Sequence, residues 1–316
     1  MNNSHPIRIG TRGSLLARTQ SGIIRDQLLP LTGGRPVELV IISTSGDQMT
    51  SQSLAQIGGK GLFVKEIEAA LLAGEIDLAV HSAKDVPVEI PGGLSLSATP
   101  PREAPNDVWI GHAGLGILKL PPGAVVGSSS LRRQSQLLML RPDIQVQPLR
   151  GNIDTRLKKV RDGVIAGTVL ALSGLRRAGL LPPDAMILPE DEFIPAAGQG
   201  TLVLETRTDD AVIRSLINQI HDAQTAAALA FERGIVRKLA GDCLAPIGVC
   251  AMPRTASGQQ GWIVRAIAAL PDGKACARAT LLTDDPSING LNALYEPLLN
   301  ALESRGVKDI LKSGAA

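Results

Sequence analysis

The sequence predicts an α/β fold with a smaller α+β part at its C-terminal end, and three observations support this prediction. Short apolar runs of β type alternate with helical patterns through the first two thirds of the chain, as in βαβ units with mainly parallel sheets. A proline-rich break at residues 100–105 can continue neither a helix nor a strand, so a second unit starts there. From residue 223 onward a helix precedes three β-type runs, which indicates an antiparallel sheet.

Length and composition describe an ordinary globular protein of about two domains, or of three small ones. The chain has 316 residues, of which 44% are hydrophobic and 20% are charged. We place the first domain at residues 1–100 with 200–218, the second at 105–195 and the third at 222–316. Aromatic residues make up only 2% and the net charge is +2. The scarcity of aromatic residues argues against a platform for single-stranded nucleic acid, which needs stacking rings. The net charge is uninformative about duplex DNA, whose binding proteins usually carry a strongly basic face.

No segment predicts export, a membrane span or a metal site. The first ten residues lack the basic start and apolar run of a secretory signal, and no apolar stretch approaches the roughly 20 residues that span a bilayer. We therefore expect a cytoplasmic protein that contacts no membrane. The three cysteines are odd in number and widely spaced, which fits reduced thiols. The four histidines show no spacing that would hold zinc, so we expect no metal.

In the first unit, strands are expected at residues 7–9, 37–42 and 78–81, with two helices between them. Thr11 or Ser14 would cap the first helix, and Phe63 would lie on the second. Residues 43–61 are polar and without periodicity, and a run of that length is typical of a lid or of a disordered loop. The segment 58–61, which contains Lys60, fits a phosphate nest, although a hinge is at least as good an interpretation.

The second unit shows the same local pattern three times: a strand ends, a small polar turn follows and a helix begins. The strands are residues 125–126, 144–146 and 169–172. In open α/β sheets, ligands bind at these carboxyl ends of the strands. Residues 196–200 form a second crossing, after which a strand at 202–205 could return to the first sheet. In the third domain we expect strands at 247–252, 262–270 and 275–282, and one closing helix around Leu294.

Arginines recur beside these strand ends and helix starts. They are Arg132, Arg133, Arg150, Arg156 and Arg177. A single arginine there would be assigned to a solvated helix face. Their recurrence favours an anion site, because a guanidinium binds a carboxylate or phosphate with paired hydrogen bonds and a helix N-terminus adds partial positive charge. The customary nucleotide-binding loops are absent, so a nucleotide would lack its cradle.

Asp85 lies where the strand at 78–81 ends and the chain must turn. One interpretation is that its carboxylate accepts hydrogen bonds from nearby backbone N–H groups while Lys84 is exposed. The alternative is a carboxylate that faces a cationic reaction centre, with Lys84 fixing a second charge. His81, inside an apolar run, is expected to be a hydrogen-bonded structural residue.

Cys243 differs from the other cysteines because it lies in a loop rich in Gly and Pro. Cys250 and Cys276 fall in apolar β-type runs, where a free cysteine is usually a small buried hydrophobe. Covalent chemistry is plausible at Cys243, although composition alone establishes neither its exposure nor a lowered pKa.

Taken together, these segments resemble the porphobilinogen deaminase family, also called hydroxymethylbilane synthase. The matching segments cover nearly the whole chain, in order. They are Ile-Arg-Ile-Gly-Thr-Arg at 7–12, His-Ser-Ala-Lys-Asp-Val-Pro at 81–87, Ser-Ser-Leu-Arg-Arg at 129–133, Arg-Gly-Asn-Ile-Asp-Thr-Arg at 150–156, Pro-Ala-Ala-Gly-Gln-Gly at 195–200, Cys243 and Pro-Ile-Gly at 246–248. Asp242, where the family often has a small residue, and Ser128, where Thr is common, are small departures that remove no needed donor.

The resemblance implies a monomeric enzyme that joins four porphobilinogen molecules head to tail, releases ammonia at each step and liberates hydroxymethylbilane. It also implies a dipyrromethane cofactor held through a thioether to Cys243. The implied fold is two domains like type II periplasmic binding proteins around a cleft, plus a small domain carrying the cofactor loop.

The resemblance also implies residue roles. Asp85 would hydrogen-bond pyrrole N–H groups and stabilise the positive charge that develops as ammonia leaves. Lys84 would position carboxylates, Phe63 would cover the substrate pyrrole, Gln199 would contribute an amide to the cleft, and Lys60 would belong to a mobile lid. Carboxylates of substrate or cofactor would be bound by Arg12, Ser14, Ser130, Arg132, Arg133, Arg150, Arg156 and Arg177.

A non-catalytic anion receptor with the same arginine-lined site is the competing interpretation. Cys243 discriminates between the two, because a receptor has no use for a covalently tethered primer.

Overall fold

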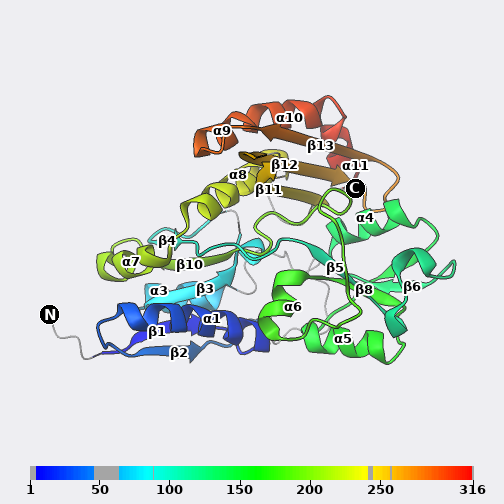
Figure 1. Ribbon diagram of the computed structural model, residues 1–316. Helices are drawn as coiled ribbons and strands as arrows, with labels where there is room; N and C mark the ends of the chain where they lie inside the picture. Colours follow the sequence, from blue (N-terminus) through cyan, green and yellow to red (C-terminus); the bar gives the residue numbers. More distant parts are fainter. Residues whose placement is uncertain (1–4, 46–63, 88, 241–244, 257, 315–316) are drawn as a thin grey trace. The chain divides into compact units, whose positions relative to one another are not determined.

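The computed structural model describes residues 5–45, 64–87, 89–240, 245–256 and 258–314 (Figure 1). Contacts within the chain divide it into two compact units. The first combines Met1–Glu103 with Thr201–Ala226, and the second combines Ala104–Gly200 with Ala227–Ala316. No helix in the described ranges is both long enough and apolar enough to cross a bilayer.

The first unit holds a five-stranded sheet in the order β2-β1-β3-β10-β4. Strand β1 (Ile7–Thr11) lies parallel to β2 (Val37–Ile41) and to β3 (Leu78–Ser82). Strand β10 (Leu202–Arg207) comes from far along the chain and pairs antiparallel with β3 and with β4 (Leu94–Ala98). The expected return of this strand to the first sheet is confirmed.

Helices cover both faces of this sheet. Helices α1 (Leu15–Leu28) and α7 (Ala211–Ile217) contribute to the apolar cluster on one face, and α3 (Lys65–Leu72) contributes to the cluster on the other. Of the two caps considered for the first helix, Ser14 is the one used, because its hydroxyl accepts a hydrogen bond from the Ala17 N–H at 3.3 Å.

The α/β part of the second unit repeats this strand order, as β7-β6-β8-β5-β9. Strand β6 (Val125–Gly127) is parallel to β7 (Gln145–Gln147) and β8 (Gly167–Ala171), whereas β5 (Asp107–Gly111) is antiparallel to β8 and to β9 (Met186–Ile187). In each sheet one strand is antiparallel to its neighbours, β10 in the first sheet and β5 in the second. Each of these two strands directly follows a point where the chain passes from one unit to the other. In each sheet four of the five strands run in the same direction, so the expectation of mainly parallel sheets is confirmed, with one antiparallel strand inserted in each.

Three helices follow the three parallel strands of this second sheet, as predicted. Helix α4 (Leu131–Leu140) follows β6, α5 (Ile153–Arg161) follows β7, and α6 (Leu172–Ala178) follows β8. Because β6, β7 and β8 are parallel, their carboxyl ends lie at one edge of the sheet. The N-termini of the three helices therefore lie at that edge too.

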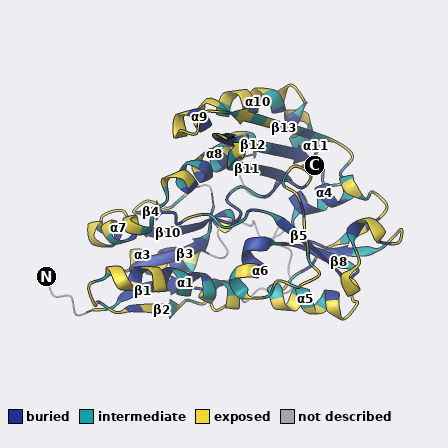
Figure 2. Ribbon diagram, viewed as in Figure 1, coloured by how far each residue is buried: buried dark blue, intermediate teal, exposed yellow. Residues whose placement is uncertain are grey.

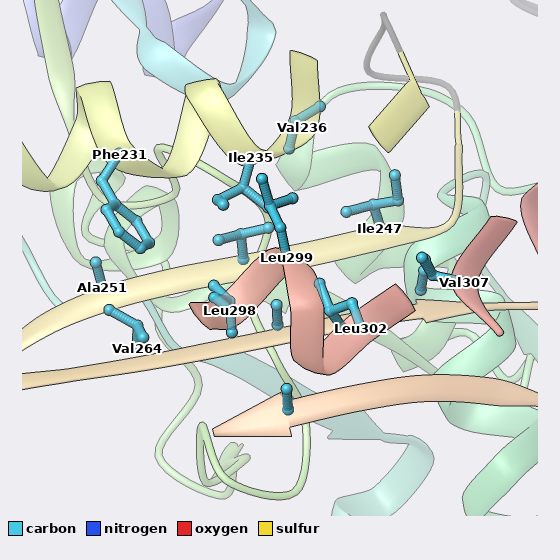
Figure 3. Close-up of a cluster of buried hydrophobic side chains, with 14 of the residues drawn as sticks. Phe231, Ile235, Val236, Ile247, Ala251, Val264, Leu298, Leu299, Leu302 and Val307 are labelled. Atoms are coloured by element: carbon cyan, nitrogen blue, oxygen red, sulfur yellow. The ribbon is translucent and has the colours of Figure 1, made fainter. Parts of the chain in front are cut away.

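The C-terminal part begins with helix α8 (Ala223–Ala240) and an antiparallel sheet in the order β11-β12-β13. The strands are β11 (Ile247–Ala256), β12 (Gln259–Ala269) and β13 (Cys276–Thr283). Side chains from α8 and from a later helix meet the sheet in one apolar cluster (Figure 3). Phe231 and Tyr295 join the two helices edge to face, with ring centroids 5.6 Å apart.

The chain closes with three short helices rather than the single one expected. They are α9 (Ile288–Ala293), α10 (Tyr295–Glu303) and α11 (Val307–Gly314). The central strands of the two α/β sheets are buried, and the outward sides of the helices are exposed (Figure 2). The predicted α/β class, with two similar α/β sheets and an α+β C-terminal part, is confirmed.

Candidate functional site

The sequence-predicted site residues that the structure describes form two sets, one in each unit. Arg12, Ser14, Lys84 and Asp85 belong to the first unit, and seven others belong to the second. Those seven are Ser130, Arg132, Arg133, Arg150, Arg156, Arg177 and Gln199. Lys60, Phe63 and Cys243 lie outside the described residues.

In the second unit, Arg132 and Arg133 at the start of α4 enclose one buried carboxylate. Arg132 Nη1 donates to Asp107 Oδ2 at 2.7 Å, and Arg133 donates to Asp107 Oδ1 from Nε at 3.0 Å and from Nη2 at 2.7 Å. Arg132 is 5% exposed, Arg133 is 8% exposed and Asp107 is fully buried. The alternative interpretation, in which these arginines lie on a solvent-exposed helix face, is therefore wrong for this pair.

This arginine pair keeps an excess of positive charge, because two guanidinium groups share one carboxylate. Burial lowers the pKa of Arg132, while the charge of Asp107 opposes that shift. Arg132 Nη2 and Arg133 Nη1 have no hydrogen-bond partner in the part of the chain that the structure describes. The pair therefore has both the charge and the donors to hold a carboxylate.

Gln199 supports the same network from the crossing that follows Pro195. Its Nε2 donates to Pro105 O at 2.6 Å and to Asp107 Oδ1 at 3.0 Å, and the residue is fully buried. Its amide donor is thus used inside the protein. We revise the expected direct contact with a substrate to a supporting contact with Asp107.

The other three predicted site arginines of the second unit, Arg150, Arg156 and Arg177, are half-buried. Arg156 Nε donates to Gly151 O at 2.8 Å, and Arg177 Nη2 donates to Gly200 O at 2.7 Å. Ser130 caps α4, since its hydroxyl accepts the Arg133 N–H at 3.4 Å. A hydrogen bond of 2.9 Å from Ser129 Oγ to the carbonyl of Leu149 ties the turn after β6 to the turn after β7. The turns after β6 and β7 are thus joined, whereas Arg177 lies in the last turn of α6 rather than at the helix start expected for it.

The first unit contains a pocket whose polar lining residues are Arg12, Ser14, Gln20, His81, Ser82 and Asp85. They come from the end of β1, from α1 and from the end of β3. Gln20 and Ser82 bind each other, with Nε2 of the amide 2.9 Å from the hydroxyl. Ile67 and Val80 add apolar surface. A small pocket with a few convergent polar groups is the usual form of a binding site.

Asp85 lies exposed at this pocket, at the end of a short 3₁₀ turn that also contains the half-buried Lys84. The turn is closed by the backbone, with the Val86 N–H donating to Ala83 O at 3.4 Å. The Asp85 carboxylate has no hydrogen bond or ion pair with any other described residue. The interpretation of Asp85 as a turn-forming residue is therefore not supported among the described contacts, and the carboxylate is available to a ligand.

Behind the pocket, His81 forms a buried pair with Glu205, a residue that sequence reasoning missed. His81 Nε2 and Glu205 Oε2 are 3.0 Å apart, and the residues are 6% and 1% exposed. His81 is expected from the sequence to be a hydrogen-bonded structural residue, and the hydrogen bond is confirmed. Glu205 could have been noticed as a charged residue ending the apolar run at 202–205.

Glu68, on α3, is a second buried carboxylate near this pair and is 7% exposed. Burial raises its pKa, and the negative charge of Glu205 raises it further. Of the two cysteines in the described ranges, Cys250 is buried as expected, whereas Cys276 is only half-buried. Cys276 starts the edge strand β13, which explains its partial exposure.

The chain matches the family model described as "Porphobilinogen deaminase, dipyromethane cofactor binding domain" over residues 7–215. A porphobilinogen deaminase of Paraburkholderia phytofirmans is 41% identical over 99% of this chain and 90% of its own length. One from Brevibacillus brevis is 41% identical over 96% of both chains. One from Syntrophobacter fumaroxidans is 50% identical over 77% of this chain and 78% of its own.

Among solved structures, the chain has a distant likeness to transport proteins. An ABC transporter from Parabacteroides distasonis is 12% identical, with a TM-score of 0.42 over 78% of this chain and 82% of that one. The ligand-binding component of an ABC-type import system from Staphylococcus aureus is 14% identical, with a TM-score of 0.38 over 73% of this chain and 74% of that one.

Proposed function

This chain belongs to the porphobilinogen deaminase family, and we propose that it joins four porphobilinogen molecules head to tail, releasing ammonia at each step and finally hydroxymethylbilane. The structural observation that supports this proposal is the exposed carboxylate of Asp85 in the polar pocket of the first unit, which has no hydrogen bond or ion pair with another described residue. Loss of ammonia leaves positive charge on a pyrrole. A fixed carboxylate held beside that charge stabilises the transition state.

Within the pocket, acidic and basic side chains bind different parts of the substrate. Asp85 accepts hydrogen bonds from pyrrole N–H groups and faces the developing cation. Arg12 and Ser14 lie across the same pocket and bind the acetate and propionate groups of porphobilinogen. The Ser14 hydroxyl accepts the N–H of Ala17, so its own proton remains available to donate to a carboxylate. Lys84 positions carboxylates beside Asp85, and Phe63 covers the pyrrole.

We propose further that a dipyrromethane is attached to Cys243 through a thioether. When bound, this group supplies the pyrrole to which the first substrate is joined. The donor set of the second unit fits such a group, because its carboxylates require buried cations and Arg132 and Arg133 offer both charge and unused N–H groups. Ser130, Arg150, Arg156 and Arg177 extend the set, and Gln199 holds Asp107 in place.

We also propose a division into three domains. Residues 1–100 with 200–218 form the first domain, residues 105–195 the second and residues 222–316 the third. The 43–61 loop with Lys60 acts as a lid. The protein is a monomer. It works in the cytoplasm on a small-molecule substrate without a metal, a membrane or a nucleic acid.

Intact-mass measurement tests the covalent group. The purified protein should carry the added mass of one dipyrromethane, and Cys243→Ser should lack it. Cys250→Ser is the matched control, because that thiol is buried, and it should retain the added mass. An unmodified wild-type mass, together with no ammonia release from porphobilinogen, would favour the anion receptor over the enzyme.

Replacement of Asp85 tests the reaction centre. Asp85→Asn keeps the shape of the side chain and removes its charge, so turnover should fall by about 10²–10³-fold, as when one fixed charge-stabilising group is lost. Ammonia release measures the turnover. The mass of the purified variant should still include the dipyrromethane. Asp26→Asn, at an exposed position on α1, is the control and should change little. Near-normal turnover of Asp85→Asn would return Asp85 to a structural role.

A further inference from the structure

The pocket of the first unit has a buried imidazole and carboxylate behind it that the proposed function leaves without a role. They come from two neighbouring antiparallel strands, β3 and β10 (Figure 1). Val203 is paired with His81, and Glu205 lies two residues further along the same strand. Side chains two residues apart in a strand point to the same face, so Glu205 reaches His81 diagonally. The strand register thus fixes the pair.

The Glu205 carboxylate is only half satisfied. Its Oε2 contacts His81 Nε2 at 3.0 Å, whereas its buried Oε1 has no hydrogen-bond partner among the described residues. Burying a carboxylate oxygen without a hydrogen bond lowers the stability of the folded state, so its presence requires an explanation. A positive charge on the neighbouring imidazole would compensate it. Glu205 is therefore suited to stabilise His81 when His81 accepts a proton.

The second ring nitrogen of His81 is the one available for chemistry. Nδ1 has no hydrogen-bond partner in the described part of the chain, and His81 lines the same pocket as Asp85. A histidine that lines a reaction pocket and has a carboxylate on one imidazole nitrogen combines the features that acid–base catalysis by histidine requires. In such pairs the carboxylate holds the ring in one tautomer and stabilises the imidazolium that forms.

We propose that His81, held by Glu205, accepts the ring proton that is released when two pyrroles are joined. This inference rests on the proposed function. In each cycle, a carbon–carbon bond forms between the methylene carbon of the incoming molecule and the free ring carbon of the receiving pyrrole. The carbon–nitrogen bond of the incoming ammonium breaks with its electron pair on nitrogen, and ammonia leaves. The hydrogen of the receiving ring carbon leaves as a proton, passes to Nδ1 of His81 and is then released to water.

Asp85 and His81 then have separate roles in one pocket. The exposed Asp85 stabilises positive charge on the pyrroles, and the buried His81 removes the proton that restores their aromaticity. Glu205 acts through His81 and is a positioning residue.

Other charged groups surround the pair. Helix α3 contributes Glu68 and the exposed Lys65, and the pocket contributes Arg12 and Asp85. The pKa of Glu68 is raised by burial and by the charge of Glu205, which favours its neutral form. Glu205 is the carboxylate in direct contact with His81, so it is the group that balances a protonated imidazole.

A kinetic isotope effect tests this assignment. Porphobilinogen would carry deuterium on its free ring carbon, so that the transferred proton is labelled. In His81→Gln, turnover should fall about 100-fold, the loss expected for one general base, and the remaining rate should become slower with deuterium than with hydrogen. Glu205→Gln should show the same isotope effect with a smaller loss. The wild-type rate should not depend on the label, because proton removal by His81 is fast.

The controls separate this inference from the proposed function. His112→Gln, in the second unit, removes an exposed imidazole that hydrogen-bonds the backbone oxygen of Val160, and should behave as wild type. If the wild type releases no ammonia, the proposed function fails. If the wild type is active and His81→Gln keeps its turnover, or loses turnover without an isotope effect, the base assignment fails and His81 is structural.

Nitrogen NMR of histidine-labelled protein gives a readout that needs no activity. The neutral form of His81 should carry its proton on Nε2, facing Glu205, and none on Nδ1. The same tautomer should be lost from the spectrum of Glu205→Gln. A proton on Nδ1 in the wild type would contradict the assignment.

Discussion

At the scale of single residues, burial decides how much an ion pair contributes to stability. Arg132 and Arg141 are both paired with an aspartate, yet Arg132 is 5% exposed and Asp107 is fully buried, whereas Asp143 is exposed. Exposed pairs contribute little because water screens them. Breaking a buried pair is costly because the remaining charge stays away from water. Asp107 is therefore the residue on which the arginine pair depends.

Asp107→Asn tests that dependence. The substitution leaves Arg132 and Arg133 buried side by side without a counter-charge, so the free energy of unfolding should fall by about 3–5 kcal/mol. Urea denaturation measures it. Asp143→Asn, which removes the exposed partner of Arg141, is the matched control and should change the midpoint little. Equal effects of the two substitutions would show that the buried network contributes no more than a surface pair.

Residues with local signals could be predicted from the sequence, and residues whose partners lie far along the chain could not. Asp85 and the arginines follow strand ends, which is a local pattern. Asp107 binds arginines 25 and 26 residues away, and Glu205 binds a histidine 124 residues away. Nothing in the immediate neighbourhood of Asp107 or Glu205 indicates those partners. Burial of a charged side chain is a property of the folded molecule.

The site residues of the second unit are positioned by a repeated strand–turn–helix arrangement. The sequence predicts this strand–turn–helix arrangement after β6, β7 and β8. The helix start that it predicts at Ile153 is the observed start of α5. Such starts were predictable because Ser, Asn and Gly occupy the turns and apolar periodicity follows. The second unit thereby gathers Ser130, Arg132 and Arg156 at one sheet edge.

Other elements escaped prediction for physical reasons. Strand β9 (Met186–Ile187) has two residues, too few to show any period. Strand β5 (Asp107–Gly111) is buried at every position, so it lacks alternation, and a short apolar run does not reveal its direction. Its antiparallel position beside β8 depends on where the chain crosses between the units. The orientation of an inserted strand is therefore set by topology rather than by local sequence.

Across the whole molecule, Glu232 joins the two parts of the second unit. The fully buried side chain on α8 accepts the Gly198 N–H on Oε2 at 2.6 Å and the Ala251 N–H on Oε1 at 2.7 Å. Gly198 belongs to the crossing that carries Gln199, and Ala251 belongs to β11 in the antiparallel sheet. One carboxylate thus connects the segment that supports the arginine pair to the domain that carries Cys243.

Glu232→Gln should weaken this connection and separate the unfolding of the two parts. Its amide NH₂ cannot accept a hydrogen bond, so one of the two N–H groups loses its partner in the interior, at a cost of about 1–3 kcal/mol.

The chain's two tryptophans report the unfolding of each part separately, since Trp109 lies on β5 and Trp262 lies on β12. With one tryptophan replaced by Phe at a time, fluorescence in urea should give coincident transitions in the parent protein. In Glu232→Gln, the Trp262 transition should move to lower urea than the Trp109 transition, whereas Glu303→Gln, an exposed change on α10, should leave them together. Coincident transitions in Glu232→Gln would mean that the apolar contacts alone hold the two parts together.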